Sequence, residues 1–196
     1  MIISDTHKFI FHHVPKTGGS SITAAIAPYC KNYQGVMPLD ETHGWQFVFH
    51  QPYYMHHAVR LLEPGDIPEG YFSFAFVRNP FAAVVSAWDS KMNFDEFVEE
   101  KIFTALEPVA RWTQFDYLTD EKDGTMLVDF IGRYEKLAED FYKVITMIGL
   151  PLMMLPKRNI TKNKLHDNYR EYYSPVSRRI VEEKYKKDLE FFEYEF

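Results

Sequence analysis

The residues best suited to chemistry lie in one short segment, Pro15–Ser21, with the sequence PKTGGSS. The apolar, strand-favouring run Phe9–Val14 precedes it, and the Ala-rich segment Ile22–Ala27, which is typical of a helix, follows it. A strand, a glycine turn and a helix direct several backbone N–H groups and a helix N-terminus at one anion. The segment therefore predicts a phosphate-binding loop.

The side chains of this loop fit the same chemistry. The lysine adds a positive charge, the hydroxyl residues add hydrogen-bond donors, and the glycines allow close approach of the backbone. The predicted phosphate ligands are six consecutive residues: Lys16, Thr17, Gly18, Gly19, Ser20 and Ser21.

The loop differs from a Walker loop, which reads G-x-x-x-x-G-K-[ST] and whose final hydroxyl holds Mg²⁺. Here Lys16 precedes the glycines, and no Gly-Lys-Ser/Thr follows. Taken alone, the segment also fits a glycine turn that leads into a serine-capped helix without any ligand.

A second strand–turn–helix unit carries further anion-binding residues. The apolar run Tyr71–Val77 ends at Arg78, and Asn79-Pro80 is a strong helix start, with Asn as the N-cap and Pro at the first helical position. Ser86 then lies about two turns into the helix. Two such units, each with donors at the carboxyl end of its strand, suit a nucleotide that is phosphorylated twice.

With both units in this order, the chain resembles the sulfotransferases that use 3′-phosphoadenosine 5′-phosphosulfate (PAPS), in the branch that contains carbohydrate O-sulfotransferases. The resemblance continues through Val128–Leu137 and Asp188–Tyr194, and so covers nearly the whole chain. It implies that Pro15–Ser21 binds the 5′-phosphosulfate and that Arg78 and Ser86 bind the 3′-phosphate.

The resemblance implies roles for residues elsewhere as well. Tyr134, in a Tyr-Glu pair, is expected to contact the nucleotide or else to pack beside a helix start. Arg158 and Lys162, in a late basic loop, are candidates to close over the 3′-phosphate. Lys16 is expected to be catalytic, because it can stabilise the bridging oxygen as the leaving phosphate gains charge.

The general base is expected just before the second strand, in Met55-His56-His57-Ala58. His57 is the first choice, because related enzymes carry a catalytic histidine in that segment and imidazole titrates near neutral pH. His56 and a carboxylate such as Glu41 or Glu63 remain open.

The surrounding segments suggest an acceptor site. Residues 31–70 mix aromatic side chains with four histidines, a composition that suits an acceptor pocket and whose spacing fits no usual zinc pattern. Arg111 or Gln114, in a segment expected to be irregular, can face the acceptor. We expect no metal, a small-molecule or carbohydrate acceptor, and no nucleic-acid partner; the oligomeric state stays open.

The composition indicates one compact domain over residues 1–196. Of these, 46% are hydrophobic, the net charge is −6, and Cys30 is the single cysteine, expected to be buried. No apolar run reaches the roughly 20 residues of a membrane span. Together with the lone cysteine, this predicts a cytoplasmic protein.

Alternating strands and helices predict an α/β fold, P-loop-like, with a mainly parallel central sheet flanked by helices. Further strands and helices are expected, in chain order, at residues 95–106 (helix), 125–131 (strand), 134–148 (helix) and 175–189 (helix). The predicted function is sulfuryl transfer from PAPS to an acceptor hydroxyl. A small kinase-like enzyme and a non-catalytic nucleotide-binding module are the alternatives.

Overall fold

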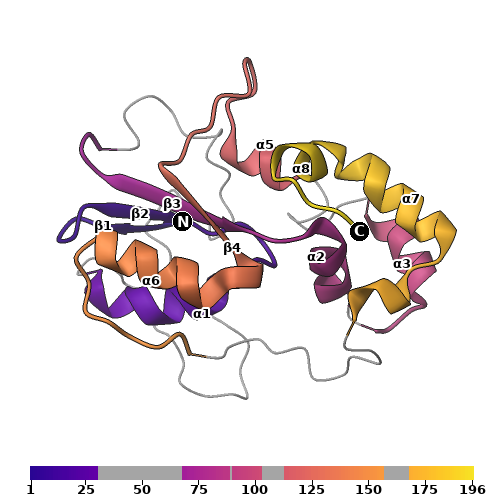
Figure 1. Cartoon of the computed structure of the whole chain (residues 1–196), viewed down its shortest axis with the longest axis horizontal. Helices are drawn as coiled ribbons and strands as arrows, with labels where there is room; N and C mark the ends of the chain where they lie inside the picture. Colours follow the sequence, from indigo (N-terminus) through magenta and orange to yellow (C-terminus); the bar gives the residue numbers. More distant parts are fainter. Residues whose placement is uncertain (31–67, 89, 103–112, 157–167) are drawn as a thin grey trace.

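The described strands form one sheet in the order β1-β2-β3-β4 (Figure 1). The computed structural model describes residues 1–30, 68–88, 90–102, 113–156 and 168–196. β1 (Ile2–Ser4) runs antiparallel to β2 (Phe9–His12), whereas β3 (Phe72–Val77) and β4 (Phe130–Arg133) continue the sheet in parallel. The predicted α/β class with a mainly parallel central sheet is confirmed.

The register of the parallel strands places their carboxyl ends at one edge of the sheet. His12, at the end of β2, pairs with Ala75, and Val77, at the end of β3, pairs with Arg133 at the end of β4. The chain therefore leaves all three strands at the same edge, which is where ligands bind in open parallel sheets.

One face of the sheet is covered by α1 (Gly19–Ile26) and α6 (Leu137–Met147), which Figure 1 shows side by side. Side chains of alternate strand residues pack there, because successive side chains of a strand point to opposite faces. This core contains Phe9, Phe11, Phe74 and Phe76 from the sheet and Ile22, Ile26, Phe141, Val144 and Ile145 from the helices, with buried Cys30.

The opposite face is covered by the short helix α5 (Gln114–Leu118) and by the end of α8 (Lys186–Phe191). Ala75 and Val77, the alternate residues of β3, pack there against Leu118 and Phe192. Residues 114–118 and 192, which are far apart in sequence, thus meet on one face of the sheet.

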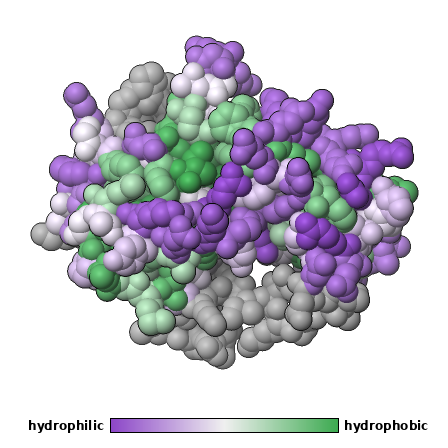
Figure 2. Space-filling view, viewed as in Figure 1, coloured by the Kyte–Doolittle hydropathy of each residue, from purple (hydrophilic) through white to green (hydrophobic). Residues whose placement is uncertain are grey.

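A third core lies beside the sheet among α2 (Pro80–Ala87), α3 (Phe94–Lys101) and α7 (Pro175–Lys184). Phe81 of α2 is fully buried and packs edge-on against Tyr173 and Phe196. The surface over α7 is largely hydrophilic (Figure 2). Among the described helices, none is long and apolar enough to cross a membrane.

Short 3-10 helices connect several of these elements: η1 (Ala27–Tyr29), η3 (Tyr134–Lys136) and η4 (Tyr169–Tyr172). The helix expected at residues 134–148 is therefore found as η3 followed by α6, and Gly149 follows with a positive φ.

Three expectations for the second half of the chain are wrong in detail. The strand expected at residues 125–131 is β4, shifted to Phe130–Arg133. Met126 instead forms an isolated bridge with Thr119 and packs in the core on the α5 side of the sheet. The segment around Gln114, expected to be irregular, is α5, which a Thr113 capping box begins. The single helix expected at residues 175–189 is broken into α7 and α8 at Tyr185.

Candidate functional site

The predicted phosphate loop is the turn between β2 and α1, and its own hydrogen bonds fix its shape. Lys16 and Gly18 both have left-handed backbone conformations, with φ of 64° and 84°. Thr17 is fully buried, and its hydroxyl donates to the Val14 carbonyl oxygen at 2.8 Å. The Thr17 hydroxyl therefore uses its proton to stabilise the loop. Thr17 can donate to an anion only through its backbone N–H.

The two glycines are required for different reasons. Gly18 has a positive φ, and a Cβ there would lie 3.0 Å from Leu137 and 3.1 Å from Tyr134. A Cβ on Gly19 would collide with the imidazole ring of His13, which is buried beneath the loop. The loop backbone thus packs closely against Leu137 and Tyr134 at Gly18 and against His13 at Gly19.

Helix α1 begins without a serine cap. Gly18 is the N-cap residue, and no side chain of the described residues caps this helix end. The serine cap expected in the alternative without a ligand is therefore not found, and Ser20 and Ser21 lie inside the first turn of α1. A helix N-terminus directs its first backbone N–H groups toward the position of a bound anion.

Arg78 directly follows β3 and reaches the phosphate loop. Its side-chain Nη1 donates to the Lys16 carbonyl oxygen at 3.2 Å, and its guanidinium stacks 4.0 Å from the centre of the Tyr134 ring. Tyr134, in turn, lies against Gly18. The structure therefore brings the loop, Arg78 and Tyr134 together at the carboxyl edge of the sheet, as the sequence predicts.

The Arg78 side chain is only 8% exposed, which is unusual for a cation. Within the described part of the chain its Nε has no hydrogen-bond acceptor, and its side chain donates only to the Lys16 carbonyl oxygen. Burial lowers the pKa of Arg78, while the nearby Tyr134 and Glu135 raise it. The guanidinium stays protonated at neutral pH, so the site contains a buried positive charge with unused donors.

Gln114 is a site residue whose role the sequence analysis assigned wrongly. It is 6% exposed and cannot face an acceptor molecule. Its Oε1 accepts the Arg78 backbone N–H at 2.7 Å, and its Nε2 donates to the Arg78 carbonyl oxygen at 2.7 Å. Arg111, the other residue considered for that role, lies outside the described residues.

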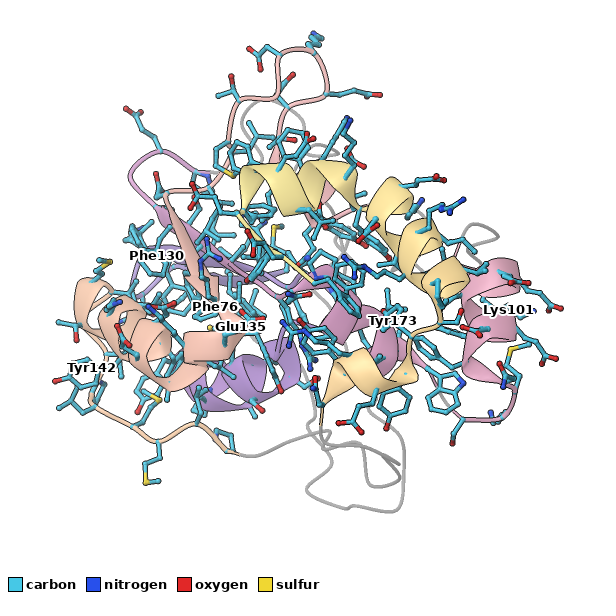
Figure 3. All side chains as sticks on the ribbon, turned by 45° about the vertical axis from the view of Figure 1, so that its right-hand side comes forward. Phe76, Lys101, Phe130, Glu135, Tyr142 and Tyr173 are labelled. Carbon is cyan, nitrogen blue, oxygen red and sulfur yellow. The ribbon has the colours of Figure 1, made fainter. Side chains whose placement is uncertain are left out.

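A network around Asn79 supports the same strand end. Asn79 caps α2 as predicted, accepting the Phe81 N–H at 3.0 Å, and its own backbone N–H donates to Glu135 Oε1 at 2.8 Å. The second oxygen of Glu135 accepts the Tyr194 hydroxyl at 2.9 Å. In Figure 3 Glu135 lies toward the middle of the molecule, whereas Tyr142 and Lys101 point outward on opposite sides.

The remaining predicted residues fall into two groups. Ser86 lies in the last turn of α2, half-buried, and its hydroxyl makes no hydrogen bond with the described residues, so it has a free donor. His57, Arg158 and Lys162 lie outside the described residues, as do His56 and the carboxylates Glu41 and Glu63.

Metal ligands do not gather in the described ranges. There, no group of three or more His, Cys, Asp or Glu side chains is placed to hold an ion. The four histidines of residues 31–70 lie outside those ranges, so the expectation that the protein binds no metal stays a prediction.

Comparison with known proteins identifies the family of the chain. An uncharacterised protein from Archaeoglobus fulgidus is 37% identical over 113 residues, covering 53% of this chain and 86% of the relative. Carbohydrate sulfotransferase 14 from Danio rerio is 25% identical over an alignment that covers 99% of this chain and 62% of that relative. No solved structure matches. The sequence model of the sulfotransferase family matches residues 1–195, and the chain therefore belongs to the sulfotransferase family.

Proposed function

We propose that the protein transfers a sulfuryl group from PAPS to an acceptor hydroxyl. The observation that carries this proposal is the buried guanidinium of Arg78, which is hydrogen-bonded to the phosphate loop and whose Nε has no acceptor among the described residues. A buried, incompletely paired charge in a site of this kind is a candidate for ligand binding. A second phosphate group is the ligand that this position fits.

The donors at this edge of the sheet fit a nucleotide that carries phosphate groups on both the 3′ and the 5′ oxygen of its ribose. The loop N–H groups, the uncapped start of α1 and the Lys16 charge suit the 5′-phosphosulfate. Arg78 and the free hydroxyl of Ser86 suit the 3′-phosphate. The Arg78 guanidinium stacks on the face of the Tyr134 ring, and the same ring lies against Gly18 of the loop.

PAPS supplies an activated sulfuryl group, whose bond to the bridging oxygen breaks as a bond to the acceptor oxygen forms. In the proposed reaction Lys16 stabilises the negative charge that develops on the bridging oxygen, and the loop N–H groups hold the phosphate that leaves. His57 takes the proton of the acceptor hydroxyl. Arg158 and Lys162 remain proposed contacts of the 3′-phosphate.

A carbohydrate is the acceptor class to test first, because the Danio rerio relative is named a carbohydrate sulfotransferase. The test is an assay with radiolabelled PAPS and a panel of neutral sugars, glycans and small phenols, followed by isolation of the sulfated product. Sulfated product with release of 3′-phosphoadenosine 5′-phosphate (PAP) is expected. Tight PAP binding without turnover on any acceptor class would favour a non-catalytic nucleotide-binding module.

A further inference from the structure

The backbone of Arg78 is held by a side chain instead of by a neighbouring strand. The last paired residue of β3 is Val77, opposite Arg133, so Arg78 lies just beyond the ladder. Its N–H and its C=O are both taken by the amide of Gln114, at 2.7 Å each. One buried amide thus fixes the orientation of the Arg78 peptide groups, and with it the direction in which the guanidinium leaves the chain.

Gln114 is itself held by a carboxylate from a distant helix. The fully buried side chain of Asp188, in α8, accepts the Gln114 backbone N–H at 2.9 Å and the Gln114 Nε2 at 3.2 Å through Oδ2. Its Oδ1 accepts the Phe115 N–H at 2.8 Å. Both oxygens of Asp188 are therefore directed at the first residues of α5.

This arrangement determines which way the Gln114 amide points. Arg78 N–H requires an acceptor, whereas Arg78 C=O and Asp188 Oδ2 both require a donor, so the oxygen and nitrogen of the amide cannot exchange places. No lysine or arginine of the described residues forms an ion pair with Asp188, whose hydrogen-bond partners are Gln114, Phe115 and the side chain of Thr113. A buried carboxylate without a cation is costly in stability, and here it orients one amide.

We propose that Gln114 and Asp188 are positioning residues that set the nucleotide preference of the site by orienting Arg78. The inference rests on the proposed function, because it concerns the contact of Arg78 with the 3′-phosphate. Neither side chain touches the nucleotide in this proposal. Both act through the backbone of Arg78.

The test measures the affinity ratio for PAP over AMP by calorimetry, since the two nucleotides differ in the 3′-phosphate alone. Gln114→Met keeps the approximate size of the side chain and removes both hydrogen bonds to Arg78. Asp188→Asn leaves Gln114 in place and removes the charge that holds it. Thr119→Val is the matched control, because it removes a partly buried hydrogen bond at the end of the same helix, from the Thr119 hydroxyl to the Phe115 carbonyl oxygen at 2.8 Å.

We expect Gln114→Met to reduce the PAP-over-AMP ratio by about tenfold, Asp188→Asn to reduce it less, and Thr119→Val to leave it unchanged. All three variants are measured well below their melting temperatures. In an Arg78→Ala background, Gln114→Met is expected to lower the melting temperature still further without changing the ratio. A merely structural role for Gln114 would not produce that dependence on Arg78.

The outcomes separate this inference from the proposed function. A wild-type protein without any preference for PAP overturns the proposed function and this inference with it. A wild-type preference that survives in folded Gln114→Met overturns the inference alone. If Gln114→Met does not fold, an unchanged ratio in Asp188→Asn overturns it, and a reduced ratio there, with Thr119→Val unchanged, supports it.

Discussion

The side chain of Arg78 donates a hydrogen bond to the carbonyl oxygen of Lys16, which joins the end of β3 to the loop after β2. The two residues are 62 positions apart in the sequence. The bond joins the two predicted anion sites directly. A substitution in one site is therefore expected to alter ligand binding at the other.

Substitution of Arg78 is expected to remove the preference for a 3′-phosphorylated nucleotide. In the proposed site, one charge-assisted contact is expected to give the wild type about a tenfold to hundredfold preference for PAP over AMP. Arg78→Ala should abolish this preference. Arg78→Lys should restore it only in part, because an ammonium lacks the planar fork that stacks on Tyr134. Calorimetry with both nucleotides provides the measurement, and equal wild-type affinities would contradict the assignment.

Gly18→Ala is expected to impair nucleotide binding as well as stability. The left-handed conformation costs an alanine about 1–2 kcal/mol, and the new Cβ would also crowd Tyr134 and Leu137. Gly149→Ala is the matched control, because Gly149 has a φ of +67° with no atom within 4 Å of a Cβ. Both variants should melt at lower temperature, but PAP affinity should fall only in Gly18→Ala. A comparable affinity loss in the control would mean that backbone strain alone is responsible.

Turnover is expected to need no divalent metal. In the proposed reaction Lys16 and the loop N–H groups supply the charge that Mg²⁺ supplies in Walker enzymes. Rates measured with and without EDTA should agree within error. A rate that collapses in EDTA and returns with Mg²⁺ would instead favour the kinase-like alternative.

His57→Ala is expected to reduce turnover by about 10²–10⁴, the usual contribution of a general base, while PAP affinity is retained. His56→Ala should lose less. Steady-state rates combined with PAP titrations check both statements. Normal turnover in His57→Ala would place the base elsewhere, for example at Glu41 or Glu63, and a parallel loss of PAP affinity would assign His57 to the donor site.

The stability of the protein is expected to depend on the protonation of Asp188. Burial raises the pKa of Asp188 to about 6 in the folded protein, above its ordinary value of 3.8. The folded state then binds this proton more tightly than the unfolded state, so the charged carboxylate costs stability above about pH 6. That cost disappears as the pH falls toward about 4.

Urea denaturation of the wild type and Asp188→Asn at several pH values measures this effect. The stability of the wild type relative to the variant should increase as the pH is lowered from about 7 to about 4, by up to about 3 kcal/mol. Other carboxylates, such as Asp140, titrate in both proteins and cancel in the difference. A difference that does not change with pH would contradict the prediction.

The parts of the site that follow local rules could be predicted from the sequence. The runs before Pro15 and Arg78 are long and apolar enough to indicate buried strands, and Asn79-Pro80 specifies a helix start. The sequence alone therefore predicts that the phosphate loop and Arg78 lie at one edge of a parallel sheet. The structure confirms that placement.

The interactions that hold Arg78 have no local signal. Gln114 and Asp188 lie 74 positions apart, and nothing in the residues around either one indicates the other. The break at Tyr185, which separates α7 from α8 and precedes Asp188, occurs without a proline or glycine. Long-range side-chain contacts decide these features, and hydrophobic periodicity does not report on such contacts.

The contacts of residues 188–195 determine when the site can form during synthesis of the chain. Asn79 Nδ2 donates to the carbonyl oxygen of Glu195, 116 positions later, and Arg133 Nη2 donates to that of Phe192. A ribosome adds residues from the N-terminus at about 5–20 per second, so the partners of Arg78 and Asn79 appear several seconds after those residues themselves. A nascent chain can form β2, β3 and the phosphate loop early, yet it acquires an oriented Arg78 only when residues 188–195 have left the ribosome.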